Sequence, residues 1–243
     1  MHRRADHAYA AARMQARFGQ LADDDDWQRL AVNRQLAPWI EQARLIPLKR
    51  WLSRLAVDAR PHALERTLRA AWSAVVAETA AWLPEPERPA VAWLAALPYL
   101  APLQAVRGED TRPPRLAWID EDPAIAAVAG EAAAPSRGKG PALAALVGGD
   151  AMALWRAEWR RRLAPVFPDA RRQAEPLIVA VAVSDPADRA AKLAALRRGF
   201  RRHAGEPVAV FFFLGLLWLE FTRLRGEVMR RATLPEIVGR AAS

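Results

Sequence analysis

The segment from residue 205 to residue 231 constrains the fold of this chain more than any other. Within it, the twelve residues Val208–Leu219 carry no charge and are nearly all large and apolar, and an arginine-rich half follows without an obvious break. Pro207 stands at the expected first helical position, where its missing N–H costs nothing. The pattern predicts one long helix, with its first half buried on all sides and its second half reaching solvent or a partner.

The apolar half of this helix is predicted to be core. A helix needs about 20 consecutive apolar residues to cross a bilayer, and this run is shorter. A helix that lies on a membrane surface or docks onto a partner is the alternative. The predicted structural core residues of the segment are Phe211, Phe212, Leu216, Trp218 and Leu224.

Helical periodicity dominates the rest of the chain as well. It predicts an all-α fold, a bundle of about ten short to medium helices in one or two lobes with no substantial sheet. Pro61 opens an amphipathic helix, and the acidic run Asp23–Asp26 caps another. Residues 91–100 are expected to form a short apolar helix, and residues 233–236 to begin a last short one.

The apolar run LIVAVAV at 177–183 is ambiguous, because a β-branched segment of this length could form a strand. No second strong strand candidate could pair with it, so a buried helix is favoured. Proline, glycine and short charged runs gather in the middle of the chain. They predict an N-terminal helical lobe at 1–104, a connecting region at 105–140 and a basic C-terminal helical lobe at 141–243.

The net charge of +9 belongs to the C-terminal part of the chain. Residues 1–150 hold 19 basic and 18 acidic side chains, a net of +1, whereas residues 151–243 hold 17 and 9, a net of +8. Such a field favours anionic partners: nucleic acid, an anionic lipid surface or an acidic protein.

The absence of cysteine excludes disulfides and cysteine metal sites and is compatible with a reducing cytoplasm. The first twenty residues lack the apolar region of a secretory signal.

One helix concentrates this charge. Asp185 and Pro186 are expected to start it, and the spacing of its apolar residues turns Leu193, Leu196 and Phe200 inward. Three interpretations of the other side of this helix remain open: a solvated face, a contact with an acidic protein, and a contact with nucleic acid or lipid. No aromatic residues are interleaved there, as single-strand binding would require. The predicted partner-binding residues are Arg197, Arg198, Arg201 and Arg202 on this helix, with Arg223 and Arg225 on the long helix.

Templates for catalysis and metal binding fail. The four histidines, at positions 2, 7, 62 and 203, have no metal-ligand spacing, and the SRGKGP segment lacks the spacing of a phosphate-binding loop. No catalytic residue, metal or cofactor is therefore predicted. Trp155 and Trp159 lie one helical turn apart and are expected to be core. Glu158 between them is expected to form an ion pair with an arginine such as Arg162.

The two ends of the chain carry a family resemblance. Gly205–Val208 opens the long helix, Glu220 is followed four residues on by Leu224-Arg225, and 234–237 forms a Leu-Pro turn. The N-terminal HAYAAARMQARF adds an aromatic residue followed by alanines and arginines. Together these segments resemble the C-type central-stalk adaptor family of bacterial and archaeal V-type rotary ATPases, whose eukaryotic members are called d-type. Family members are longer, so one helical unit would be missing or reduced, at about 101–141. Between Pro207 and Glu220 the chain has FFFLGLLWL where the family has a Tyr and a Lys-Glu pair, and the spacing is about two residues longer.

This resemblance implies a non-catalytic, all-helical adaptor that sits on the membrane c-ring, receives the central-stalk shaft and transmits torque. It implies the other components of a V-type ATPase as partners and a cytoplasmic location peripheral to the membrane, with nucleic acid not a partner. Two alternatives are a stand-alone helical regulatory or nucleic-acid-binding protein that uses the arginine face, and a helical enzyme with a pocket among the tryptophans.

Overall fold

The computed structural model describes residues 2–106, 143–146, 149–182 and 188–241, and within these ranges the chain is helical with no strand, which confirms the all-α prediction. The first half contains α1 (His2–Phe18), α2 (Asp24–Ala31), α3 (Leu36–Ala43), α4 (Lys49–Leu52), α5 (Pro61–Ala81), the 3₁₀ turn η1 (Glu85–Glu87), α6 (Arg88–Ala92), η2 (Trp93–Tyr99) and α7 (Leu100–Val106). The second half contains η5 (Leu143–Leu146), α9 (Ala151–Leu163), α10 (Ala170–Gln173), α11 (Glu175–Ala182), α12 (Arg189–Arg202) and α13 (Ala209–Ala241).

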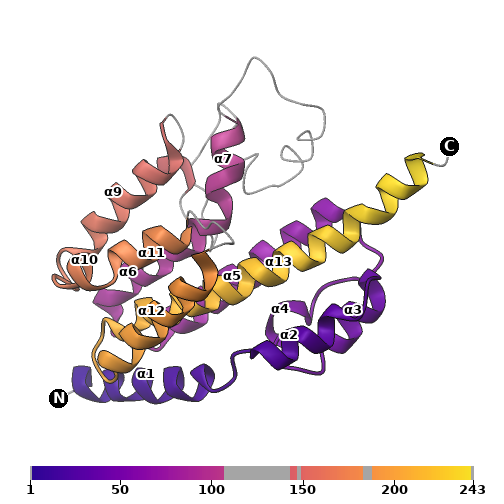
Figure 1. The fold of residues 1–243 in the computed structure, drawn as a ribbon. Coiled ribbons are helices and arrows are strands. Elements are labelled where there is room, and N and C mark those ends of the chain that lie inside the picture. The colour runs from indigo at the N-terminus through magenta and orange to yellow at the C-terminus, as the bar shows by residue number, and fades with distance from the viewer. Residues whose placement is uncertain (1, 107–142, 147–148, 183–187, 242–243) are drawn as a thin grey trace.

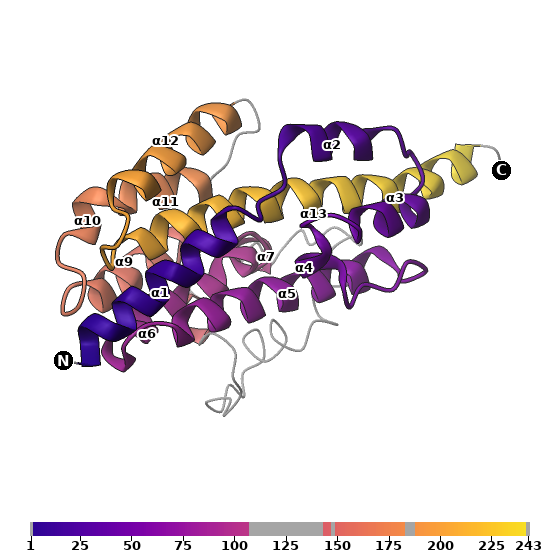
Figure 2. The ribbon, with the colours of Figure 1, turned by 90° about the horizontal axis from the view of Figure 1, so that it is seen from below.

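Helix α13 is the axis of the molecule. It has 33 residues, which corresponds to a length of about 50 Å. Helices α1, α3, α5, α11 and α12 all pack against it, and Figures 1 and 2 show it running across the whole body with its last turns extending beyond the other helices. Its first half is buried on all sides, and Phe211, Phe212, Leu216, Trp218 and Leu224 all lie in the core, as their pattern predicted.

The second half of α13 is covered by the chain's own N-terminal quarter. The guanidinium of Arg223 lies 4.3 Å from the ring centroid of Trp27 on α2, and that of Arg231 lies 4.9 Å from the ring of Trp39 on α3. Arg231 also donates to the carbonyl oxygen of Asn33 and is fully buried. This half was expected to reach solvent or a partner, and part of its charge is used instead in cation–π contacts inside the fold.

Helix α13 begins and ends differently from the sequence prediction. Pro207 lies in a turn before the helix, where N–H groups bond three residues back, and the helix proper begins at Ala209. At the other end α13 runs through residues 233–241, where a separate short helix was predicted. The reason is visible at Thr233, whose hydroxyl donates backward to the carbonyl oxygen of Met229 and does not cap a new helix.

Local sequence explains the well-predicted helix starts. Asp23 caps α2 by accepting from the backbone N–H of Asp26, whose side chain accepts in return from the N–H of Asp23. Pro61 occupies the first turn of α5. The ambiguous run at 177–183 is helical through Ala182, as α11, which confirms the helix reading; Val183 lies outside the described residues.

The predicted helix at 91–100 is instead the end of α6, a buried 3₁₀ segment (η2) and the start of α7. Pro98 has no N–H to donate to the carbonyl oxygen of Leu94, four residues earlier. That oxygen accepts instead from the indole Nε1–H of Trp72 on α5, at 2.9 Å. A side chain from another helix thus takes the place of the missing α-helical hydrogen bond.

The buried apolar residues form one cluster that runs from Ala10 to Val228 and draws on both halves of the chain. The predicted connecting region lies almost wholly outside the described residues, so the division into lobes stays a prediction. Across the described part of the chain, no helix is long and apolar enough to span a membrane.

Candidate partner-binding surface

The last two turns of α12 carry an unpaired basic surface. Arg198, Arg201 and Arg202 are exposed and Arg197 is half-buried, while Leu196 and Phe200 on the opposite face are buried. None of the four guanidinium groups forms a hydrogen bond or an ion pair with another described residue. We call these four residues the α12 arginine face. It follows the predicted helical spacing, although α12 begins at Arg189, and the predicted cap at 185–186 lies outside the described residues.

Two glycines hold this helix tightly on α13. A Cβ atom at Gly199 would overlap the ring carbons of Phe212, and one at Gly215 would lie 2.8 Å from Cδ2 of Leu196. The two helices therefore approach more closely than larger residues would allow. Phe200 on α12 also stacks on Phe18 of α1, with ring centroids 4.8 Å apart. This packing fixes the position of α12, so the α12 arginine face would need little rearrangement to bind a partner.

The chemistry of the face is that of anion recognition. Each guanidinium offers five N–H donors in a planar fork that suits carboxylate or phosphate oxygens. Four such groups of like sign on two turns repel one another, and an anionic partner would relieve that repulsion. Many other arginines in this part of the molecule are already used: Arg156 and Arg160, for example, both bind the buried carboxylate of Glu175 at 2.6 Å.

Arg223 and Arg225 do not join the α12 arginine face. Arg223 stacks on Trp27 and lies 3.7 Å from Asp24, and Arg225 forms an ion pair with the buried carboxylate of Glu65 on α5. Arg189, the first residue of α12, donates to the carbonyl oxygen of Leu219, which places Arg223 near the opposite end of α12 from the face. The six predicted residues therefore fall into the group of four on α12, three of which are exposed, and two residues that are bound within the fold.

A buried carboxylate that no sequence pattern singled out for a structural role lies at the centre of the molecule. Glu220 on α13 is 6% exposed and accepts hydrogen bonds from the backbone N–H of Ala22 and from Nε1 of Trp51, each at 2.8 Å. Nε of Arg50 lies 3.6 Å from its Oε1. Burial raises the pKa of Glu220, and the nearby Arg50 charge and the two hydrogen bonds offset only part of that effect. Glu220 is part of the segment that carries the family resemblance, but its partners lie too far away in sequence to be predicted.

The tryptophans in the described part of the chain pack as core, and six of them have their indole N–H satisfied. Trp93 donates to the carbonyl oxygen of Trp155 at 3.0 Å, and Trp155 donates to that of Trp93 at 3.3 Å. Trp155 and Trp159 are both fully buried and stack 5.1 Å apart, which confirms the core prediction for this pair. The other satisfied indoles are those of Trp51, Trp72, Trp159 and Trp218.

Glu158 forms the expected ion pair with Arg162 at 2.7 Å, and a second one with Arg161 at the same distance. The hydrogen bond from Arg161 is the largest cause that lowers the pKa of Glu158 to about 2. No group of histidine, aspartate and glutamate side chains in the described ranges is arranged to hold a metal ion.

Comparison of the chain with protein-family models, with curated proteins and with solved structures gives no match.

Proposed function

We propose that this chain is a non-catalytic structural adaptor of a V-type rotary ATPase, coupling the central-stalk shaft to the membrane c-ring in proton or sodium transport. Its place in that assembly is cytoplasmic and peripheral to the membrane. The proposal combines the resemblance of the two chain ends to the C-type central-stalk adaptors with the way these ends meet in the fold.

The observation that carries the proposal is the junction of the two resembling segments. They lie at opposite ends of the sequence, yet α1 packs against α13 (Figure 2). Just after α1, the backbone N–H of Ala22 donates to Glu220, the same glutamate that marks the family pattern in α13, across 198 positions. The two segments that resemble the family are distant in sequence but form one contiguous unit in the fold. This supports a common origin of that unit with the C-type central-stalk adaptors.

The architecture suits a part that transmits force. A torque-transmitting adaptor has to be stiff. Five other helices pack against α13 along most of its length, and aromatic contacts such as that of Trp72 with Trp218, at 4.8 Å, add to this support. The α12 arginine face provides a charged contact surface on this body. In the proposed assembly it faces acidic partner surfaces or lipid headgroups.

A tagged version of the chain, recovered from detergent-solubilised native membranes and analysed by mass spectrometry, tests the proposal. The c-ring and the central-stalk proteins are expected to be recovered with it. The matched sample carries Arg201→Glu and Arg202→Glu, which is expected to reduce this recovery. Recovery of the chain without any other rotary ATPase component would contradict the proposal.

The unpaired α12 arginine face also favours a second candidate, a stand-alone regulatory or nucleic-acid-binding protein. Phosphate contacts release counterions, so binding through this face would weaken steeply as salt rises. Titration of fluorescent duplex DNA and of single-stranded RNA at several salt concentrations tests this candidate. Binding whose logarithmic salt slope falls when Arg201 and Arg202 are reversed would support it, and no binding at low salt would exclude it.

A further inference from the structure

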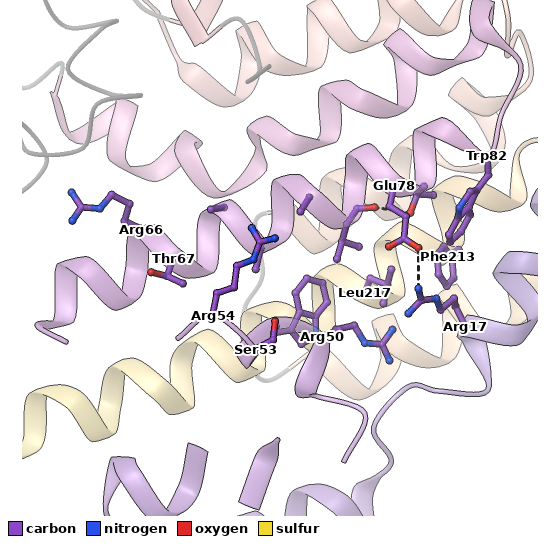
Figure 3. Close-up of a pocket in the computed structure, with 16 residues that line it drawn as sticks. Arg17, Arg50, Ser53, Arg54, Arg66, Thr67, Glu78, Trp82, Phe213 and Leu217 are labelled. Carbon is purple, nitrogen blue, oxygen red and sulfur yellow. Dashed lines mark hydrogen bonds and ion pairs between the residues drawn. The ribbon is translucent and has the colours of Figure 1, made fainter. Parts of the chain in front are cut away.

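A cavity of about 480 Å³ opens between α5, α4 and α1, with α13 beneath it (Figure 3). This is within the range of about 300–1,000 Å³ that is typical of small-molecule sites. The space exists because α5 presents Ala70, Ala71 and Ala74 on this side, and none of them has a side chain long enough to fill it. The cavity lies apart from the α12 arginine face, and the inference drawn from it does not depend on the proposed function.

The floor of the cavity is apolar. Phe213 and Leu217 of α13 and Trp82 at the end of α5 contribute buried side chains to it, and Val75 continues the same surface. Transfer of apolar surface from water onto such a floor is favourable by about 25 cal/mol per Å². The floor therefore suits a hydrocarbon chain or an aromatic body.

The rim is strongly basic. Four arginines line the cavity, at positions 17, 50, 54 and 66, against a single carboxylate, that of Glu78. Figure 3 shows Arg66 at one end and the Arg17–Glu78 ion pair at the other, with Arg54 and Arg50 between them. Since Glu78 is already paired with Arg17 at 2.9 Å, it does not compensate the charge of Arg54.

Arg54 and Arg50 lie at the middle of this rim and differ in exposure and in hydrogen bonding. Arg54 is exposed and has no hydrogen bond or ion pair with another described residue. Arg50 is largely buried and donates to the backbone carbonyls of Pro47 and Gln20. Burial lowers the pKa of Arg50, and the Glu220 charge opposes this only in part, so a further anion nearby would stabilise its charged form.

We infer that this cavity binds an anionic amphiphile, a molecule with one phosphate or carboxylate head and an apolar body. The head accepts hydrogen bonds from Arg54 at the rim, with Arg50 beside it, and the apolar body lies on Phe213, Leu217 and Trp82. Charge-assisted hydrogen bonds to a guanidinium fix the head, and burial of the body supplies most of the affinity. A lipid of a bilayer and a free amphiphile share this chemistry.

Isothermal titration calorimetry of the full chain with monododecyl phosphate, below its micelle concentration, tests the site. Saturable binding of one molecule per chain is expected. Inorganic phosphate lacks the apolar body and dodecyl maltoside lacks the charge, so each is expected to bind at least about tenfold more weakly. Equal binding of dodecyl maltoside, or no saturable binding of monododecyl phosphate, would overturn the inference.

Two variants locate the binding. Arg54→Gln removes the free charge, and Ala74→Leu fills the cavity while every charge stays in place; each is expected to weaken monododecyl phosphate binding by about tenfold or more. The matched control Arg34→Gln removes an exposed arginine outside the cavity and is expected to leave binding unchanged. Unchanged thermal midpoints establish that all three variants are folded, and undiminished binding in Ala74→Leu would place the ligand elsewhere and overturn the inference.

Flotation with phosphatidylglycerol vesicles, and with phosphatidylcholine vesicles as control, distinguishes the two sources. Flotation with phosphatidylglycerol that monododecyl phosphate competes away identifies a bilayer lipid as the ligand. Monododecyl phosphate binding without flotation identifies a free amphiphile. Flotation that persists in both Arg54→Gln and Ala74→Leu would assign membrane binding to another surface and contradict a lipid in this cavity.

Discussion

Glu220 on α13 and Trp51 on α4, 169 positions apart, are joined by a buried hydrogen bond of 2.8 Å from the indole Nε1–H to Oε1. The other carboxylate oxygen accepts from the backbone N–H of Ala22. The turn after α1 and the short helix α4 are therefore both anchored to the central helix by one carboxylate. Because this carboxylate is buried, it connects the N-terminal quarter of the chain to the core at an electrostatic cost.

The buried carboxylate of Glu220 predicts that the free energy of unfolding depends on pH. Burial raises the folded-state pKa of Glu220 above its ordinary value of 4.5, so the folded state holds this proton more tightly than the unfolded state. The contribution of Glu220 to the free energy of unfolding is therefore most favourable below about pH 4.5, and falls as the pH rises through the raised pKa. Urea denaturation at a series of pH values should show this fall in the wild type and not in Glu220→Gln. Parallel curves for the two proteins would contradict the buried ionisable role.

The contribution of Glu158 to stability is expected to depend on pH in the opposite direction. Its ion pairs with Arg161 and Arg162 lower its pKa to about 2, so their contribution is present above about pH 4.5 and is lost as the pH falls toward 2. Because the pairs lie at the surface, Glu158→Gln should lower the free energy of unfolding by no more than about 1 kcal/mol near neutral pH. The difference between variant and wild type should shrink on acidification. A difference that grew as the pH fell would show that the ion pairs are not the cause.

The packing of α12 on α13 predicts contrasting effects of one substitution at two glycines. Gly199→Ala would force Cβ into the ring of Phe212 and should cost about 1–3 kcal/mol of stability. Gly226→Ala meets no atom within 4 Å and lies inside α13, so it should stabilise the protein by about 0.5–1 kcal/mol. Thermal and urea denaturation of both variants measure this contrast. Equal stability of the two would mean that α12 and α13 are not in close contact at Gly199.

The apolar half of α13 should behave as core. Phe212→Ala and Trp218→Ala should each lower the free energy of unfolding by about 3–5 kcal/mol, because both side chains are buried and each would leave a cavity. Val32 is highly exposed, and Val32→Ala should change stability by no more than about 0.5 kcal/mol. A loss within experimental error at both core positions would contradict the burial of the Val208–Leu219 run.

Several parts of the fold could be predicted from sequence because their causes are local. The long uncharged run indicated the buried half of α13, Pro61 marked the start of α5, and Asp23 marked the start of α2. The 3₁₀ form of η2 depends on an indole from α5 that bonds to the Leu94 carbonyl, and no local pattern contains that partner.

At the candidate site, too, features with local causes could be predicted and contacts between distant segments could not. Helical spacing alone placed the four residues of the α12 arginine face on one side. The pairing of Arg225 with Glu65 and the partners of Glu220 are contacts between segments far apart in the chain, which a single sequence does not reveal. Both involve charged groups that a sequence reading assigns to the surface, whereas the structure buries Glu65 and Glu220 and binds Arg225 to one of them.

The α12 arginine face predicts a separation of binding from stability. Reversal of two of its members, Arg201→Glu with Arg202→Glu, should weaken association with an acidic partner. The thermal midpoint should stay nearly unchanged, because both side chains are exposed and neither pairs with another described residue. The matched control is Arg34→Glu with Arg60→Glu, which changes the net charge equally at exposed positions far from α12 in the sequence. A large fall in the midpoint of the first double variant alone would show that these arginines support the fold.

The proposed place of this chain in a rotary ATPase fixes its number of copies per complex, which can be measured. Native mass spectrometry of the affinity-purified, detergent-solubilised assembly should give one copy of the chain for each c-ring, together with the central-stalk proteins. The Arg201→Glu, Arg202→Glu protein should be depleted from that assembly, and the Arg34→Glu, Arg60→Glu protein should be retained. A chain recovered alone, or bound only to nuclease-sensitive material, would contradict the adaptor account.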